Sequence, residues 1–118
     1  MSLQLTERTV GDVVIIDLSG KITLSDGGDA MLKDKVRSLV HQGRKKMILN
    51  LGDVSYVDSA GLGELVQAYA TVSKNGGALK LLKTTKRIKD LLSITKLLTV
   101  FETYDSEAEA VTSFSAAV

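Results

Sequence analysis

The sequence predicts an α/β fold: one mixed sheet of four to five strands that opens with a β-hairpin and carries helices mainly on one face. Segments rich in apolar and β-branched residues alternate with amphipathic segments along most of the chain. Such alternation implies parallel strands joined by helical crossovers. The first two apolar segments are instead separated only by Gly11-Asp12, a tight turn that favours antiparallel pairing. With 118 residues, the stretch 1–118 is expected to form a single domain with its own core.

Local patterns predict the opening hairpin and the first helix. Residues 3–9 alternate apolar and polar side chains, as in a half-buried strand, and residues 13–18 are mostly β-branched. A loop is expected over residues 20–28, where small and polar residues interrupt the pattern. From Asp29 onward, apolar residues fall on one side of a helix and charged residues largely on the other. Gly43 is well suited to end that helix.

The centre of the chain predicts a buried strand followed by a helix. Residues 47–51 lack alternation, which is typical of a strand buried on both faces. From Leu62, apolar residues recur every three to four positions, and Asn75-Gly76-Gly77 is expected to end the resulting helix. A short acidic loop over 52–58 joins the two elements. Ser59 then occupies the expected N-cap position, where its hydroxyl would lie near unpaired backbone N–H groups.

The last third of the chain predicts shorter elements. They are a strand at 78–82, a helix at 86–92, an edge strand at 100–104 and a helix reaching Phe114. Thr84 or Thr85 is expected to cap the first of these helices. Ser106-Glu107-Ala108-Glu109 forms a capping-box pattern before the second.

Composition argues against several classes of function. A net charge of +1 argues against dominant nucleic-acid binding, and no cysteine is present to act as a thiolate nucleophile or metal ligand. A single histidine, His41, cannot build a multi-histidine metal site or a catalytic triad. We therefore expect no cofactor. No apolar run approaches the about 20 residues of a membrane span and no signal-peptide pattern opens the chain, so a cytoplasmic location is expected.

The patterns that an enzyme would use are incomplete. Asp53 and Asp58 share one predicted loop, as in a glycosidase or a magnesium site, but aspartate is also common at turns and helix starts. Gly61-Leu62-Gly63 matches part of a dinucleotide fingerprint, yet Val66 stands where the third glycine is needed. The sequence therefore favours a protein that is not an enzyme. Weak nucleotide binding at this helix start remains an alternative that titration with GTP and ATP would test.

Ser59 has two interpretations, because a hydroxyl at a helix start can serve as a cap or carry a phosphate. A helix N-terminus is a natural anion site. Gly61 and Gly63 remove side chains from the first turn and would leave its N–H groups open to an approaching group. Each glycine also costs roughly 1 kcal/mol of helix stability, which suggests close approach of a partner or a phosphate. Asp58 could help a kinase to recognise the neighbouring hydroxyl.

The same residues carry a resemblance to a known family. Leu49-Asn50-Leu51 followed by Val57-Asp58-Ser59-Ala60-Gly61-Leu62-Gly63 resembles the signature of the anti-sigma factor antagonists, the bacterial STAS-domain family. The likeness covers essentially the whole chain. Residues 18–22 resemble the loop after that family's second strand, and residues 76–81 resemble its return to the fourth strand.

This resemblance implies a partner switch. In such proteins an anti-sigma factor that is also an ATP-dependent serine kinase phosphorylates the serine matching Ser59. The unphosphorylated form captures the anti-sigma factor and frees the sigma factor. By the same likeness, the expected partner-binding residues are Asp58, Ser59, Ala60, Gly61, Leu62, Gly63, Thr23 and Asp26.

One position departs from the family pattern. Many members carry an aspartate where this chain has Thr23, and Asp26 or Asp29 is a candidate for the missing charge. A second hypothesis keeps the fold but assigns the chain to another class. It would then be a scaffold in a stress-sensing assembly or a cytosolic subunit of a lipid or anion transporter, without phosphorylation at Ser59.

Overall fold

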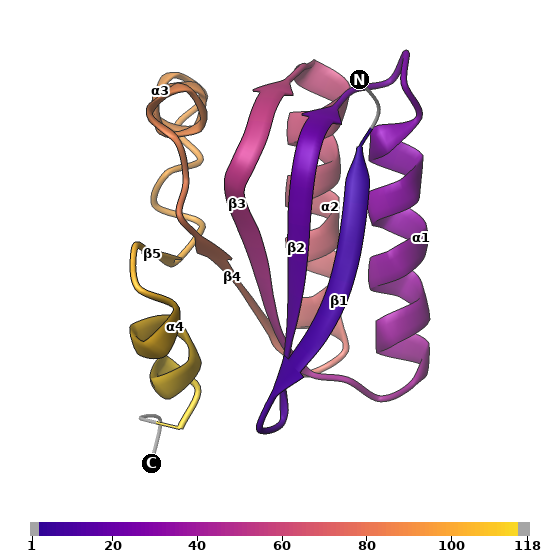
Figure 1. Ribbon diagram of the computed structural model, residues 1–118, viewed down its shortest axis with the longest axis vertical. Coiled ribbons are helices and arrows are strands. Elements are labelled where there is room, and N and C mark those ends of the chain that lie inside the picture. Colours follow the sequence, from indigo (N-terminus) through magenta and orange to yellow (C-terminus); the bar gives the residue numbers. More distant parts are fainter. Residues whose placement is uncertain (1–2, 116–118) are drawn as a thin grey trace.

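The computed structural model describes residues 3–115 and shows one twisted sheet with helices packed against it (Figure 1). The strands are β1 (Gln4–Val10), β2 (Val13–Ile22), β3 (Lys46–Val57), β4 (Ala78–Leu82) and β5 (Thr103–Tyr104). The helices are α1 (Gly28–His41), α2 (Ser59–Lys74), α3 (Lys86–Ile94) and α4 (Glu107–Ser113).

The sheet has the order β1-β2-β3-β4-β5. β1 pairs antiparallel with β2 through the predicted hairpin, whereas β2, β3, β4 and β5 run parallel to one another. Gly11 in the hairpin turn has φ +62°, a conformation that glycine adopts without strain. The predicted α/β fold with a mixed sheet of four to five strands is therefore confirmed, and the sheet has five.

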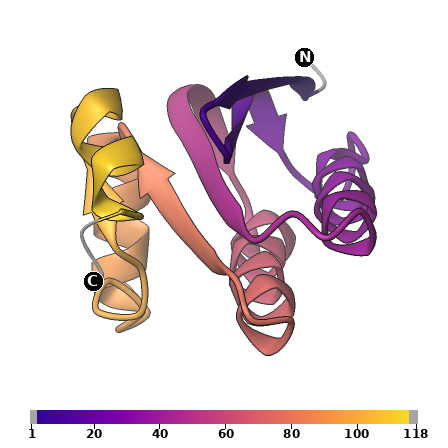
Figure 2. The same cartoon turned by 90° about the horizontal axis from the view of Figure 1, so that it is seen from below.

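Helices cover the two faces of the sheet unequally (Figure 2). α1 and α2 pack on one face, where the main core includes Leu32, Leu65 and Leu49, and α3 adds Ile88 to the same cluster. α4 covers the other face with a smaller apolar cluster of Val13, Ile15, Ile48, Leu82 and Ala110. The prediction that helices lie mainly on one face is confirmed, with α4 as the exception.

Strand β3 is buried on both faces along its first half, as its unbroken apolar run predicted. Met47 and Leu49 belong to the main core, whereas Ile48 belongs to the cluster beneath α4. All three side chains are fully buried. Side chains that alternate between two apolar layers explain why this segment shows no polar face.

The prediction that loops begin at Gly20 and Gly52 is wrong, because β2 and β3 both run further. Their parallel pairing continues to Ile22 opposite Val57, across two register shifts. Gly20 lies between those shifts with φ +98°, a backbone conformation that tolerates such an irregularity. The added length carries β2 and β3 to the point where α2 begins.

The smaller elements fit the predictions in part. Thr85 caps α3, since its Oγ1 accepts the N–H of Ile88 at 3.3 Å. Ser106 caps α4 by accepting the N–H of Glu109 at 3.3 Å. The edge strand predicted at 100–104 is shorter, because Phe101 turns into the core and packs edge-to-face on Tyr69.

Candidate functional site

The site lies where β2 and β3 end and α2 begins, at the upper edge of the sheet in Figure 1. Parallel strands deliver their carboxyl ends to the same edge, and Ile22 and Val57 are paired there. The loop from β2 to α1 and the start of α2 therefore lie side by side. This places Thr23 and Asp26 in the neighbourhood of Asp58.

Asp58 is the residue that joins these segments. Its Oδ1 accepts the N–H of Gly61 at 2.7 Å and its Oδ2 accepts the N–H of Leu24 at 3.1 Å. Its own N–H donates to the carbonyl oxygen of Ile22 at 3.4 Å. The carboxylate thus caps α2 and also fixes the loop that leaves β2. The N–H of Gly61, and then that of Leu24, hold the pKa of the Asp58 carboxyl below its ordinary value.

The prediction that Ser59 is the N-cap is wrong. Asp58 has the extended backbone of a cap residue, and Ser59 is the first residue of α2. Both residue types cap well, and the place where β3 ends decides between them. Because Asp58 makes the capping bond, the exposed Ser59 side chain is not used for it.

The two glycines at the start of α2, Gly61 and Gly63, have different structural explanations. Gly61 is buried, and a Cβ there would lie 2.0 Å from the carbonyl oxygen of Ile22. Its N–H is already bonded to Asp58, so the prediction that this group is open to a partner is wrong. Gly63 is exposed, with nothing within 4 Å of an added Cβ. Packing thus explains Gly61, whereas no contact within the described chain explains Gly63.

Thr23 is a buried residue that stabilises the loop between β2 and α1. Its side chain is 4% exposed, and its Oγ1 donates to Asp26 Oδ2 at 3.2 Å and accepts the N–H of Asp26 at 3.4 Å. The carboxylate of Asp26 is therefore held by Thr23 in an exposed loop. This arrangement places a negative charge in the loop that contains Thr23.

Leu24 is an exposed residue of this site that the sequence patterns did not single out. It is 68% exposed, while its backbone N–H is fixed by Asp58. The only sequence signal was a leucine within a polar loop. Of the other predicted residues, Ala60 and Leu62 are half-buried, and Leu62 packs against the main core.

The predicted pair of carboxylates, Asp53 and Asp58, does not come together in one site. Asp53 lies within β3, five positions before Asp58, so roughly 15 Å of extended backbone separates the two residues. That distance excludes a shared magnesium ion or a glycosidase pair. Within residues 3–115, no group of three or more His, Cys, Asp or Glu side chains could hold a metal ion. In the same range, no helix is long and apolar enough to cross a membrane.

Comparison with known proteins decides the family. The family model described as STAS domain matches residues 4–110. The chain belongs to the STAS-domain family. The resemblance drawn from the segment around Ser59 is thereby confirmed. Among relatives of this STAS-domain chain, the anti-sigma-B factor antagonist of Bacillus subtilis is 38% identical over 82 residues, which are 70% of this chain and 72% of that protein.

Solved structures share the fold of this STAS-domain chain. An anti-sigma factor antagonist from Thermotoga maritima superposes with a TM-score of 0.85 at 27% identity, over 92% of each chain. The anti-sigma factor antagonist SpoIIAA in its unphosphorylated form gives 0.72 at 18% identity, over 99% of this chain and 100% of that one. The phosphorylated form of SpoIIAA from Bacillus gives 0.73 at 20% identity, over 96% and 99%. At these identities the SpoIIAA structures show the fold alone.

Proposed function

We propose that this protein is an anti-sigma factor antagonist whose capture of an anti-sigma factor is switched off by phosphorylation of Ser59. The main support is the position of Ser59. It is the first residue of α2 and its side chain is exposed, while its neighbour Asp58 makes the capping hydrogen bond. The hydroxyl can therefore be modified without loss of the cap. The name of the Bacillus subtilis relative supports the antagonist role, and the existence of a phosphorylated SpoIIAA supports the modification.

Gly63 supports approach of a partner at this point. Ser59 and Gly63 are four residues apart, so they lie on the same face of α2. A glycine inside a helix costs about 1 kcal/mol relative to alanine, and no contact within the described chain requires one there. We infer that Gly63 keeps the surface beside Ser59 free of side chains so that a kinase and a binding partner can come close.

The proposed partner surface consists of the exposed residues of the site. These are Leu24, Asp26, Ser59 and Gly63. Asp58 and Gly61 support this surface without being part of it, because both hold the start of α2 against the end of β2. The protein is then a regulator that binds another protein, and the kinase activity belongs to that partner.

Electrostatics explain how a phosphate would act as a switch. It adds about −1.5 to −2 charges beside the Asp58 carboxylate. In the free protein the N-terminus of α2 tolerates this charge. Against a partner surface shaped for a hydroxyl, burial of an uncompensated charge costs roughly 3–4 kcal/mol. Such a loss weakens binding by a few hundred-fold, on the order of what a switch needs.

The test is the intact mass of the protein after incubation with ATP and candidate anti-sigma kinases from the same genome. A single gain of about 80 Da that maps to Ser59 is expected for one phosphate. No gain with any candidate would contradict phosphorylation. A stable complex with a transporter or stress-sensing assembly would then favour the scaffold hypothesis.

A further inference from the structure

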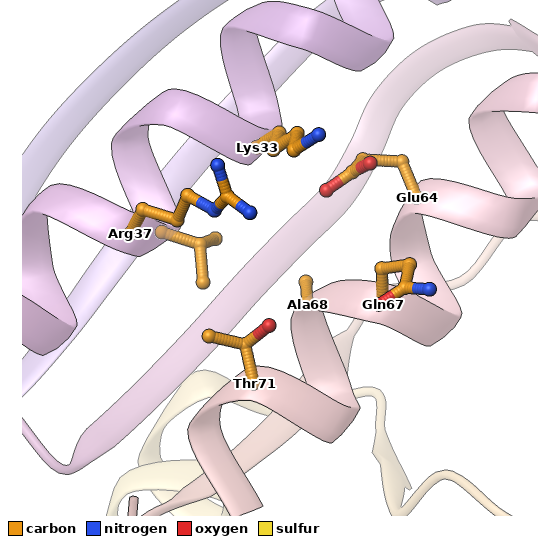
Figure 3. Close-up of a pocket in the computed structure, with 7 residues that line it drawn as sticks. Lys33, Arg37, Glu64, Gln67, Ala68 and Thr71 are labelled. Atoms are coloured by element: carbon orange, nitrogen blue, oxygen red, sulfur yellow. The ribbon is translucent and has the colours of Figure 1, made fainter. Parts of the chain in front are cut away.

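A groove between α1 and α2 lies outside the site around Ser59 (Figure 3). Its volume is about 240 Å³, and the residues around it include Lys33, Val36, Arg37, Glu64, Gln67 and Ala68. Val36 and Ala68 are buried and form an apolar floor where the two helices are in contact. The small side chain of Ala68 leaves room above this floor, and longer polar side chains form the walls.

The charged walls of the groove converge from the two helices. Lys33 and Arg37 are four residues apart and therefore share one face of α1. Figure 3 shows both side chains directed toward Glu64, which extends from α2 on the opposite side. A groove with two cations on one wall and one carboxylate on the other offers separate sites for a negative and a positive group.

These three charges are not paired with one another. The ion pairs found among residues 3–115 include none of Lys33, Arg37 and Glu64. Partial burial is the largest cause that raises the pKa of the Glu64 carboxyl. Lys33 and Arg37 oppose that effect, whereas the carboxylates of Asp29 and Asp34 add to it. The groove thus keeps a partly desolvated carboxylate and two nearby cations without hydrogen bonds between them.

We propose that this groove binds a small zwitterion of the size of a free α-amino acid. The carboxylate of the ligand accepts hydrogen bonds from Arg37 and Lys33, for which the planar guanidinium offers two parallel donors. The ammonium group of the ligand donates to the Glu64 carboxylate. A simple anion would leave the Glu64 carboxylate without a partner, and a simple cation would leave Arg37 and Lys33 without one.

The size of the groove agrees with this class of ligand. At about 240 Å³ it is smaller than the pockets that take drug-sized molecules, which start at about 300 Å³. The apolar floor of Val36 and Ala68 would contact the Cα and a short side chain of the ligand. This binding site goes beyond the proposed function, since it uses none of the residues around Ser59.

The experiment is an amide NMR titration of the isotope-labelled full chain with glycine, L-serine and L-leucine. We expect saturable shifts confined to residues 33–37 and 64–68 for at least one of them. N-acetyl-L-serine lacks the ammonium group and L-serinamide lacks the carboxylate. Each should bind at least about tenfold more weakly than L-serine, because it leaves one charged wall of the groove without a partner.

Matched variants assign the contacts. Arg37→Gln and Glu64→Gln should each weaken binding at least about tenfold. Lys35→Gln is the control, because Lys35 also lies on α1 but pairs with Glu7 outside the groove, and its affinity should match the wild type. Absence of saturable shifts up to about 50 mM amino acid would overturn the proposal. Inorganic phosphate that binds as tightly as L-serine would overturn it as well. Neither result depends on a partner protein or a kinase.

Discussion

At the scale of single residues, Asp58 and Ser59 divide two roles that the sequence predicts as alternatives for Ser59. Asp58 holds α2 and the loop after β2 through two backbone N–H groups. Ser59 is left exposed at the first helical position. This division allows the charge on Ser59 to change while the cap stays intact.

The substitution Ser59→Asp tests the switch at this position. We expect it to weaken capture of the anti-sigma partner by roughly a few hundred-fold, for the reason given for the phosphate. The melting temperature should stay near wild type, because an acidic side chain is tolerated in the first turn of a helix. Binding can be measured by calorimetry with the partner identified from phosphorylation.

Ser59→Ala is the matched control for that experiment. It should bind the partner like the unphosphorylated wild type and gain no phosphate on incubation with ATP and the kinase. Tight binding by Ser59→Asp would argue against the switch. Incorporation of phosphate into Ser59→Ala would point to another acceptor, such as the exposed Ser55.

The two glycines of the first turn of α2 should respond oppositely to alanine. In Gly61→Ala the new Cβ would meet the Ile22 carbonyl oxygen at 2.0 Å and its carbon at 2.9 Å, both backbone atoms. We expect a loss of about 2–3 kcal/mol or more in the free energy of unfolding. Gly63→Ala meets nothing within 4 Å and should gain about 0.5–1 kcal/mol. Urea denaturation measures both values, and equal effects would mean that α2 does not approach β2 as closely as described.

At the scale of elements, local patterns and tertiary contacts explain different parts of the structure. The helical period in residues 62–72 and the unbroken apolar run at 47–51 are local, and both elements formed as predicted. The continuation of β2 and β3 to Ile22 and Val57 depends on pairing across two register shifts, which no single segment reveals.

The same distinction applies to the candidate site. The sequence located the segment from Asp58 to Gly63, because a strand, a serine and a helix start stand in order there. It did not separate the roles of Asp58 and Ser59, since both residue types are good caps and the end of β3 selects one. The position of Leu24 and the need for glycine at position 61 both depend on contacts between segments that are distant in the sequence. Only the folded structure shows those contacts.

Helix α4 offers a test of how an element is held. The Lys80 side chain is only 8% exposed, and its Nζ bonds to Ser113 Oγ at 2.7 Å and pairs with Glu102 at 3.1 Å. Nζ also lies 4.4 Å from the ring centre of Phe114. Lys80→Ala removes a buried stem together with these contacts and should cost about 2 kcal/mol. Hydrogen exchange of the α4 amides should accelerate in this variant.

An exposed lysine on the sheet provides the comparison. Lys46 pairs with Asp12 at 2.6 Å, but the side chains are 37% and 73% exposed. Lys46→Ala should therefore change the free energy of unfolding by about 0.5 kcal/mol or less. If urea denaturation gave the two lysine variants equal losses, Lys80 would not be the anchor of α4.

At the scale of the whole molecule, Arg8 links the opening hairpin to α4, which lies near the other end of the described chain. From β1 it pairs with Asp17 in β2 at 2.6 Å and bonds to Glu107 in α4 at 2.9 Å. Its guanidinium is the largest cause that lowers the pKa of both carboxyl groups from their ordinary values of 3.8 and 4.5. These contacts connect the edge hairpin to the helix on the second face of the sheet.

The lowered pKa values predict loss of stability in acid. Asp17 and Glu107 bind protons more weakly in the folded chain than in the unfolded one, so stability rises with pH through their titration. Their contribution is fully present above the ordinary pKa values of 3.8 and 4.5, and it is lost as pH falls below these values and through the lowered pKa values of the folded chain. Arg8→Gln removes the cause of both shifts, and the free energy of unfolding should then fall less steeply with acid. Urea denaturation at a series of pH values measures that slope.

Glu64→Gln gives the change of opposite sign. The pKa of Glu64 is raised by burial, so the folded chain holds that proton more tightly and its contribution falls as pH rises through the titration. In the wild type, the stability that Glu64 contributes as it becomes protonated partly offsets the stability that Asp17 and Glu107 lose in acid. Removal of the Glu64 carboxyl should therefore steepen the acid limb, whereas Arg8→Gln flattens it. Slopes in both variants equal to that of the wild type would show that neither the Arg8 contacts nor the burial of Glu64 controls the stability of the fold in acid.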